Sequence, residues 1–447
     1  TGAMSDTSTR ALQKEAGRIT KLVTVKEGGH HKMTRMLDGI ALHPVLGPIL
    51  FFVMLFFMFQ AVFSWAEAPM DMVEGTFAII GEAVATYIPE GIFRSFIQDG
   101  LIAGVGSVLV FLPQIIILFS FILLLEASGY MARAAFIMDK LMAKVGLNGR
   151  AFIPLLSSFA CAIPGIMATR TIANHRDRIT TIMIAPLMTC SARLPVYTLM
   201  IAAFIPNDPV LGYFGLQGVV FFTLYLAGIV SAIIVAAVMK KTITKGTLQP
   251  FLMELPKYQL PRLKHVFLEL WQRVRAFLRR AGTIILYAAI ALWALTLYPN
   301  PPEDATEADI YYSAAGLIGR TLQPVFEPLG FNWEISIALV PGMAAREVAV
   351  SALGTVYALQ GDEDQVAESL ATVLQSAWPL STALAFLAWF IYAPQCLATL
   401  ATARRETNSW GWTAFMTGYL FGLAYLIAMI VNLAAKAFAS VPAFNSK

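Results

Sequence analysis

Residues 151–169 read Ala151-Phe-Ile-Pro-Leu-Leu-Ser-Ser-Phe-Ala-Cys161-Ala-Ile-Pro164-Gly-Ile-Met-Ala-Thr169, an apolar stretch that a proline and a glycine interrupt beside a cysteine. A proline inside a helix removes a backbone donor and frees a carbonyl upstream, and such unwound backbone is tolerated at membrane depth only where it is buried or lines a cavity. The other two cysteines also lie beside prolines in apolar surroundings, in Cys190-Ser-Ala-Arg-Leu-Pro195 and Pro394-Gln-Cys396. The pattern predicts broken membrane helices with thiols near the breaks.

The composition is typical of a membrane protein. Of the 447 residues, 57% are hydrophobic and 13% are charged, and the mean hydropathy is +0.67, which is not expected of a soluble domain of this length. Runs long enough to cross about 30 Å of hydrocarbon occur near 43–65, 106–127, 179–204, 214–239, 282–299, 378–403 and 412–436. Two interrupted apolar segments, 151–169 and 333–355, are expected to be re-entrant or broken. The predicted fold is an all-α polytopic membrane protein with about seven full spans.

Lysine and arginine cluster beside the spans, and this bias sets the orientation of a membrane protein. The basic tail before the first span places the N-terminus in the cytoplasm, the acidic loop over 66–102 lies outside, and the C-terminus is expected outside. A basic amphipathic pattern near the middle of the chain predicts a helix along the cytoplasmic surface. The net charge of +4 is small, so no nucleic-acid partner is implied.

Two parts of the sequence follow the same plan of span, connector, interrupted segment and span. Gly146-Leu-Asn148 leads to Pro164-Gly, and Gly330-Phe-Asn332 leads to Pro341-Gly342 in a shorter second copy. Because one span separates the copies, we expect inverted repeats, although glycine and proline also recur by chance in membrane proteins. The expected division is a tag scar (1–4), a cytoplasmic N-terminal tail (5–40), a first span with an outer amphipathic segment (41–105), repeat 1 (106–204), a linking span (214–239), a cytoplasmic amphipathic helix (258–280), repeat 2 (282–403) and a last span (412–436).

The three thiols are the leading candidate ligands. In transporters built from inverted repeats the substrate site lies near the midplane, where broken helices meet, so Cys161, Cys190 and Cys396 are predicted to converge. Thiolates prefer soft or borderline cations such as Fe(II), Zn(II) or Cu(I), and no histidine lies in the apolar core. The alternative is that each cysteine is a small buried hydrophobe. The helix-break or gate residues are expected to be Pro164, Gly165, Pro195, Pro341, Gly342 and Pro394.

Further polar and sulfur side chains are secondary candidates around these thiols. They are Glu126, Gln114, Met188, Ser191, Gln395 and Glu347. Arg193 and Arg346 are charged groups at depth, which are expensive there. They either pair with a carboxylate or with freed carbonyls or contact the substrate directly, and the pairing is favoured because a bare arginine would repel a metal cation. No phosphate-binding loop, H-E-x-x-H or G-x-S-x-G motif occurs, so no catalytic site is expected.

Five stretches form a combined signature: Leu125-Glu126-Ala-Ser-Gly-Tyr-Met-Ala-Arg-Ala-Ala-Phe136, the turn from Cys161 to Ala168-Thr-Arg170, Met188-Thr-Cys190-Ser-Ala-Arg-Leu-Pro195, Ala345-Arg-Glu347 and Arg405-Glu-Thr-Asn-Ser-Trp410. Together they resemble the membrane portion of the bacterial ferrous iron transport protein B family over about 40–436. The resemblance implies a transporter that imports Fe(II) as its substrate across the bacterial cytoplasmic (inner) membrane. It also implies two inverted Gate-type repeats whose cysteines line the path.

The sequence departs from the family in two respects. Members usually begin with a GTP-binding G domain, which this sequence lacks, so GTP and Mg(II) are expected only in a G domain supplied in cis or in trans. Small cytoplasmic Feo accessory proteins are further expected partners, and whether the chain forms a homo-oligomer stays open. The second departure is at the third cysteine, where Gln395 stands as an extra residue between Pro394 and Cys396. If that segment is helical, the extra residue rotates the Cys396 side chain about the helix axis by about 100°.

Two other functions are compatible with the sequence. A Gate-type protein could carry or recognise a nucleoside or another organic solute, because a fold does not fix a function. A sensor or scaffold could instead dock a soluble G protein through the basic tail and the 262–280 helix. Dependence of transport on the thiols would distinguish iron transport from transport of an organic solute. Vectorial flux would distinguish both kinds of transporter from a sensor or scaffold.

Overall fold

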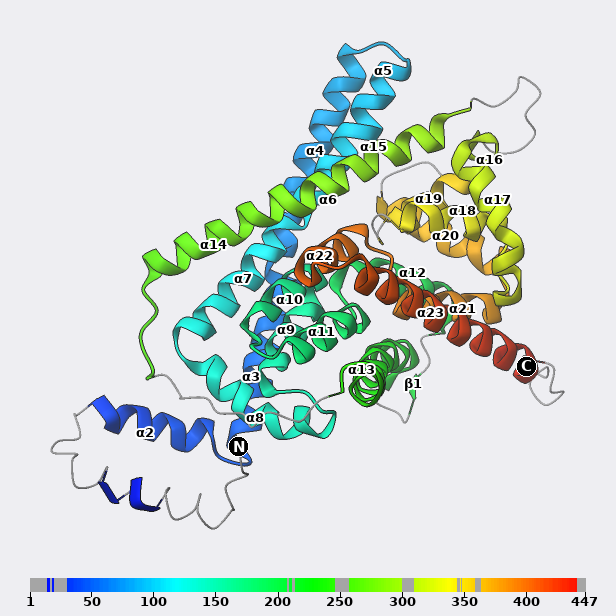
Figure 1. Cartoon of the computed structure of the whole chain (residues 1–447). Helices are drawn as coiled ribbons and strands as arrows, with labels where there is room; N and C mark the ends of the chain where they lie inside the picture. Colours follow the sequence, from blue (N-terminus) through cyan, green and yellow to red (C-terminus); the bar gives the residue numbers. More distant parts are fainter. Residues whose placement is uncertain are drawn as a thin grey trace.

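The computed structural model describes residues 14–16, 18–19, 30–206, 209–210, 214–245, 257–299, 309–343, 346, 348–357 and 363–439. Among these residues nearly all regular structure is helical, and the exception is a two-residue antiparallel pairing of β1 (Pro209–Val210) with β2 (Phe214–Gly215). This confirms the predicted all-helical fold (Figure 1).

The N-terminal part begins with a bent pair. Helix α2 (His30–Ala41) meets α3 (Leu46–Gln60) at 89°, and the π-helical turn η1 (Ala61–Trp65) leads into α4 (Glu67–Tyr87). The chain then returns through α5 (Ile92–Ser95), the π-helical turn η2 (Phe96–Ile102), α6 (Ala103–Val110) and α7 (Leu112–Ala127). Helices α4 and α6 pack side by side and project from the rest of the molecule (Figure 1).

The first copy of the repeated plan continues from α7 through a series of short helices. These are α8 (Tyr130–Lys144), η3 (Gly149–Ala151), α9 (Phe152–Ala160), α10 (Ala162–Ala168), η4 (Thr169–Thr171), α11 (His175–Ile184), η5 (Ala185–Leu187), η6 (Ser191–Arg193) and α12 (Leu194–Phe204). The linking helix α13 (Leu216–Thr242) follows the β pairing. It packs against α11, α12 and α21.

The second copy begins on a continuous rod formed by α14 (Leu263–Phe277), the π-helical turn η7 (Leu278–Gly282) and α15 (Thr283–Leu297). Its remaining elements are α16 (Asp309–Tyr312), α17 (Ala314–Phe326), η8 (Glu327–Leu329), α18 (Trp333–Gly342), α19 (Val348–Val356), α20 (Glu363–Ala377), α21 (Leu380–Tyr392) and α22 (Leu397–Thr407). The last helix, α23 (Trp410–Ala439), packs along α21.

Five described helical stretches are long and apolar enough to cross a membrane: 92–127, 175–204, 216–242, 380–407 and 410–438. The bent pair at 34–58 raises the number to six if it is one span, so the described helices support five or six spans where the sequence predicted about seven. The expected span at 282–299 is an apolar helix of only 15 residues, Thr283–Leu297, which covers about 22 Å. It reaches a greater length only because it continues α14.

The helix expected over 258–280 covers most of this range and continues beyond it. Residues 257–262 are not helical, and the helix begins at Leu263 and runs through η7 into α15 without a break. Figure 1 shows α14 and α15 in line. The basic residues in the π turn lowered the local hydropathy and concealed the continuity.

Both interrupted segments fold back as tight helix–turn–helix units. Helix α9 packs against α10, and α18 packs against α19. A Cβ added at Gly165 would lie 1.9 Å from Ser158 Oγ and 2.7 Å from the Pro154 carbonyl oxygen. A Cβ added at Gly342 would lie 3.0 Å from the Ala349 Cβ. The predicted gate glycines therefore stand where the arms of each unit approach most closely.

The two copies also enter these units in the same way. Gly146 and Gly330 have φ of 78° and 80°, in the left-handed region that glycine adopts without strain. Two residues later, Asn148 accepts a hydrogen bond from the Arg150 N–H, and Asn332 accepts one from the Ile335 N–H. These side chains cap the helices that follow, so the sequence matches at Gly146-Leu-Asn148 and Gly330-Phe-Asn332 mark equivalent structural signals.

Candidate functional site

Each cysteine occupies the N-cap of the helix that begins after a break. Cys161 separates α9 from α10 with φ −155° and ψ 131°, Cys190 precedes η6 with φ −89° and ψ 163°, and Cys396 precedes α22 with φ −163° and ψ 98°. All three residues are extended, half-buried and free of disulfides. The unwound backbone therefore lies at the thiols themselves.

The prolines occupy positions that suit these breaks. Pro164 and Pro195 lie in the first turns of α10 and α12, where a missing N–H costs no helical hydrogen bond. Pro394 lies within the unwound stretch between α21 and α22. Pro341 differs from the expectation, because it lies inside α18 and the helix ends one residue later, at Gly342.

Two buried arginines satisfy the carbonyls at the breaks. Arg193 donates to the carbonyl oxygens of Pro186 at 2.8 Å and Met188 at 3.3 Å. Arg346 donates to the carbonyl oxygens of Gln395 at 3.1 Å and Ala393 at 3.3 Å. Since a buried carbonyl without a donor costs about 1–3 kcal/mol, these guanidinium groups stabilise the unwound backbone. The sequence-based expectation that they pair with freed carbonyls describes both.

Arg346 also connects the cysteines. Its Nη1 lies 4.0 Å from Cys190 Sγ, and its Nε donates to the carbonyl oxygen of Gln395, the residue before Cys396. Cys161 and Cys396 pack against one apolar cluster that includes Ile115 of α7. Helix α10, which Cys161 caps, packs directly on α22, which Cys396 caps (Figure 1). The three breaks therefore meet in one region of the molecule.

Three of the secondary candidates lie in the same region. Ser191 donates a 3.4 Å hydrogen bond to the Oε1 atom of Gln114, which is buried in α7. Gln395 is 1% exposed, and both of its side-chain amide atoms are buried without a hydrogen-bond partner among the described residues. An orphaned buried amide is rare in proteins. The Gln395 amide thus supplies polar capacity beside Cys396 that the described conformation does not use.

The other secondary candidates are placed differently. Met188 is buried in the main core, and its backbone oxygen serves Arg193. Glu126 lies at the surface end of α7 and pairs with Arg273 of α14 at 3.2 Å. It stands about 18 Å along the helix from Gln114. Glu347 lies outside the described residues.

The thiols do not form a closed metal cage in this conformation. Within the part of the chain that is described, no three His, Cys, Asp or Glu side chains are grouped closely enough to hold a metal ion. The donor types fit a borderline cation. A guanidinium, however, lies against Cys190 where such a cation would approach.

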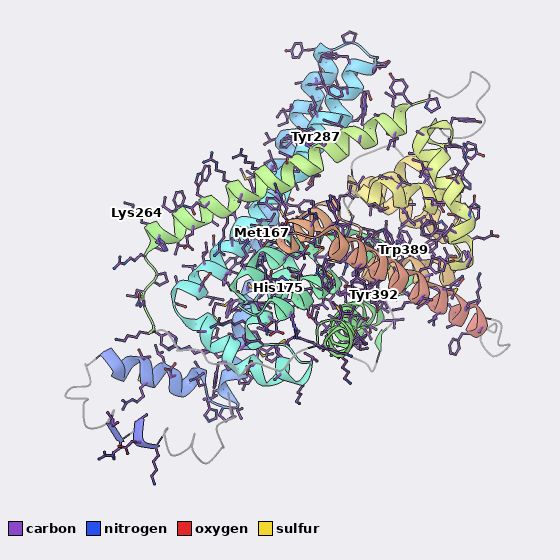
Figure 2. All side chains as sticks on the ribbon, viewed as in Figure 1. Met167, His175, Lys264, Tyr287, Trp389 and Tyr392 are labelled. Carbon is purple, nitrogen blue, oxygen red and sulfur yellow. The ribbon has the colours of Figure 1, made fainter. Side chains whose placement is uncertain are left out.

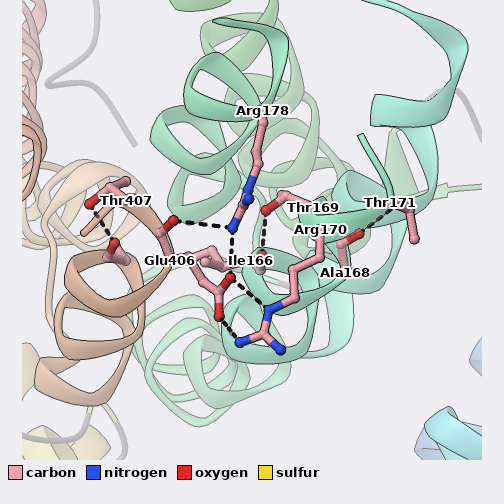
Figure 3. A network of polar contacts seen from close by, with 9 residues as sticks. Ile166, Ala168, Thr169, Arg170, Thr171, Arg178, Glu406 and Thr407 are labelled. Atoms are coloured by element: carbon pink, nitrogen blue, oxygen red, sulfur yellow. Dashed lines mark hydrogen bonds and ion pairs between the residues drawn. The ribbon is translucent and has the colours of Figure 1, made fainter. Parts of the chain in front are cut away.

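An ion-pair network that no sequence pattern indicated joins the two copies. The Glu406 carboxylate of α22 accepts hydrogen bonds from Arg170 at 2.6 and 2.8 Å and from Arg178 at 2.9 Å (Figure 3). The glutamate side chain is only 3% exposed. Both Arg170 and Glu406 stand in the quoted motifs, but they are 236 residues apart, and only a fold brings them together.

Comparisons with known proteins agree with this architecture. The family model described as "Nucleoside recognition" (Gate) matches residues 108–204 and 278–410, two ranges that overlap the two parts of the sequence with the repeated plan. The model described as "Ferrous iron transport protein B C terminus" matches residues 221–273 between them. The chain is thus a helical membrane protein with a Gate region divided in two.

Curated relatives make the assignment specific. Fe(2+) transporter FeoB of Leptospira interrogans serogroup Icterohaemorrhagiae serovar copenhageni is 44% identical over 88% of this chain and 58% of its own length. The transporter of the same name from Campylobacter jejuni is 35% identical over 92% of this chain and 67% of its own length. An Fe(2+) transport protein A/Fe(2+) transporter FeoB fusion protein of Porphyromonas gingivalis is 39% identical over 89% of this chain and 51% of its own length.

The chain belongs to the ferrous iron transport protein B family and represents its membrane portion. It spans a little more than half the length of the Leptospira relative. No solved structure matches the chain significantly.

Proposed function

We propose that this chain forms the membrane path of a ferrous iron transporter and that Fe(II) passes the three helix breaks as its substrate. The observation that carries the proposal is the placement of all three thiols at N-caps of broken helices that meet in one region. Thiolates suit a borderline cation such as Fe(II). The FeoB names of the relatives supply the identity of the metal.

The described conformation fits an unloaded, closed state. The thiols are not gathered into a metal cage, and the Arg346 guanidinium holds the carbonyls of the third break while it lies beside Cys190. A resident positive charge opposes an incoming dication, because two unit charges 4 Å apart interact by about 4 kcal/mol at an effective dielectric constant of 20. Loading therefore requires Arg346 to withdraw, which frees carbonyl oxygens at the same moment.

Movement of the second folded-back unit, α18–α19, would withdraw Arg346. The residue lies between α18 and α19, and its bonds tie that unit to the break between α21 and α22. Movement of the unit would open both the thiol region and the break. We propose that the units α9–α10 and α18–α19 act as the gates of two inverted Gate repeats, as alternating access requires.

Family membership also supports a proposal for the cellular setting. We propose that the chain acts in the bacterial cytoplasmic membrane with its N-terminus inside, where the basic residues before α3 lie, and that its full set of spans is about seven. A GTP-binding G domain, in cis or in trans, would bias the gates. The name of the Porphyromonas relative, a fusion with Fe(2+) transport protein A, supports a small Feo protein as a further partner.

Uptake by the reconstituted chain tests the proposal. Liposomes containing the full chain are given an inward Fe(II) gradient, and internal iron is measured for the wild type and for Cys161→Ser, Cys190→Ser and Cys396→Ser. Loss of one ligand should lower Fe(II) affinity or flux roughly tenfold, while the melting temperature of each protein stays near that of the wild type. Wild-type flux in all three folded variants would remove the thiols from the path.

A nucleoside is the second candidate substrate, because the matching Gate model carries the description "Nucleoside recognition". The same liposomes separate the two functions. Nucleoside flux that is indifferent to the cysteine substitutions would favour this alternative, whereas Fe(II) flux that depends on them excludes it as the main activity.

A further inference from the structure

An open pocket of about 470 Å³ lies where the α14–η7–α15 rod passes α22. Its lining residues are Gln272, Arg275, Ala276, Arg279 and Arg405. Three guanidinium groups from two separate parts of the chain thus face one space, and no acidic residue lines it. All three arginines are exposed, so water screens their mutual repulsion, and an anion in the pocket would reduce that repulsion further.

Two neighbouring arginines, Arg273 and Arg404, have partners of their own, unlike these three. Arg273 pairs with Glu126 and Glu269, and Arg404 bonds to the Asn408 side-chain oxygen and stacks over Trp410. Within the described ranges no acidic side chain forms an ion pair with Arg275, Arg279 or Arg405. Three arginines without a described acidic partner therefore line one pocket, while other described basic residues that lack one, such as Lys264, lie elsewhere on the rod.

The rod changes its helical geometry at the pocket. Arg279 belongs to the π-helical turn η7, Leu278–Gly282, and single π turns occur frequently at functional sites because they redirect side chains. Arg275 precedes this turn by one helical turn. The wider turn thus sets the direction of a guanidinium that faces α22.

The pocket lies at the polar ends of two apolar segments. Arg279 stands four residues before Thr283, where the apolar α15 begins, and Arg405 stands two residues before the end of the candidate span 380–407. The basic residues of both segments predict the cytoplasmic side. Arginines at that level meet the phosphate groups of the lipids, and the cytoplasmic leaflet carries anionic headgroups.

We propose that this pocket binds the phosphate of an anionic lipid headgroup and so fixes the α14–α15 rod to α22 at the membrane surface. Guanidinium groups donate paired hydrogen bonds to phosphate oxygens. A single phosphate could bridge Arg275 and Arg279 on the rod to Arg405 on the last helix of the second copy. This site is independent of the proposed iron path, and its test measures no transport.

Lipid titration with native mass spectrometry tests the site. The full chain in detergent is titrated with phosphatidylglycerol or phosphatidylcholine, and bound lipid is counted. The wild type should retain phosphatidylglycerol in preference to phosphatidylcholine. The combined variant Arg275→Gln, Arg279→Gln, Arg405→Gln should lose about tenfold in affinity for the anionic lipid, with phosphatidylcholine binding unchanged. The single variants Arg275→Gln and Arg405→Gln should each show part of the loss.

A matched control removes the same charge elsewhere. Lys257, Arg262 and Lys264 are exposed residues on or just before α14, outside the pocket, and Figure 2 shows Lys264 at the end of the rod far from Tyr287 of α15. Their combined change to Gln should alter phosphatidylglycerol affinity less than about twofold. An equal loss of phosphatidylglycerol affinity in the control would overturn the proposed binding site, because it would mean that affinity depends only on the total charge.

A second arm distinguishes the source of the phosphate. Inorganic phosphate is titrated against bound phosphatidylglycerol, and weak competition only at high concentration supports the lipid. Tight binding of inorganic phosphate that needs the same three arginines would overturn the lipid as occupant in favour of a soluble phosphate. Equal retention of both lipids by the wild type would overturn the proposal entirely.

Discussion

Glu406 of α22 and Arg170 of η4 form a two-pronged ion pair, with the glutamate oxygens 2.6 and 2.8 Å from the arginine nitrogens (Figure 3). The pair joins the end of the first folded-back unit to the last helix of the second copy. Arg178 of α11 adds a third bond to the same carboxylate at 2.9 Å. The two halves are therefore fastened directly beside the helices that Cys161 and Cys396 cap.

Glu406→Gln should destabilise the protein by about 2 kcal/mol, since neutralising a buried carboxylate leaves two arginines without their counter-charge. The loss stays moderate because Arg170 is 55% exposed and is partly solvated. Denaturant unfolding in detergent measures it. Glu90→Gln is the control, because the Glu90 side chain is 95% exposed and lies 3.9 Å from Arg94. Equal stability of both variants would show that the network does not hold the halves together.

Arg193→Met should cost about 2–4 kcal/mol, because two carbonyls at the break before Cys190 lose their donor in a buried site. Arg262→Met, at an exposed position, should be nearly neutral. Thermal unfolding of both proteins checks the expectation. A fully stable Arg193→Met variant would mean that water or another group satisfies the carbonyls.

Arg346→Gln should bind Fe(II) at least about tenfold more tightly than the wild type, because it removes a positive charge 4.0 Å from Cys190 Sγ. Arg346→Lys keeps the charge and should remain near the wild-type affinity. Equilibrium dialysis with Fe(II) under reducing conditions measures both. Weaker binding by a folded Arg346→Gln variant would instead make the arginine part of the loaded site.

Gly165→Ala should destabilise the first folded-back unit by roughly 1–3 kcal/mol, because the added Cβ would meet the Pro154 carbonyl oxygen at 2.7 Å. Adding Ser158→Ala should not restore stability, since the backbone contact remains. Gly422→Ala in α23 has open space around the new Cβ and should be neutral or slightly stabilising. Unfolding midpoints in detergent compare the three. Similar midpoints for Gly165→Ala and Gly422→Ala would mean that the arms can separate at no cost.

Most of the long apolar helices could be predicted, because the thickness of the membrane sets the length of the apolar run that crosses it. The apolar runs near 106–127, 179–204, 214–239, 378–403 and 412–436 coincide with the five long apolar helices. The run at 282–299 did not reveal that its helix continues from Leu263, since Arg279 and Arg280 interrupt the hydropathy within a π turn. Local hydropathy therefore predicted the lengths of the apolar runs, but it did not predict that α14 continues into α15.

The breaks were predictable because proline and cysteine lie close together in the sequence. The hydrogen bonds to the carbonyl groups at the breaks were only partly predictable. The sequence suggested that Arg193 and Arg346 donate to freed carbonyls, but it could not identify those carbonyls, because the acceptors of Arg346 lie 47 and 49 residues away. Glu406 received no role for the same reason. Contacts between distant segments depend on packing that no local pattern encodes.

The most direct test is anomalous diffraction at the iron edge from crystals of the full chain soaked anaerobically with Fe(II). The predicted result is a peak about 2.3 Å, a metal–thiolate distance, from at least two of the sulfur atoms of Cys161, Cys190 and Cys396, with Arg346 moved away from Cys190. Iron bound elsewhere, with the three thiols still packed apart and Arg346 still on the carbonyls of Ala393 and Gln395, would contradict the proposed path.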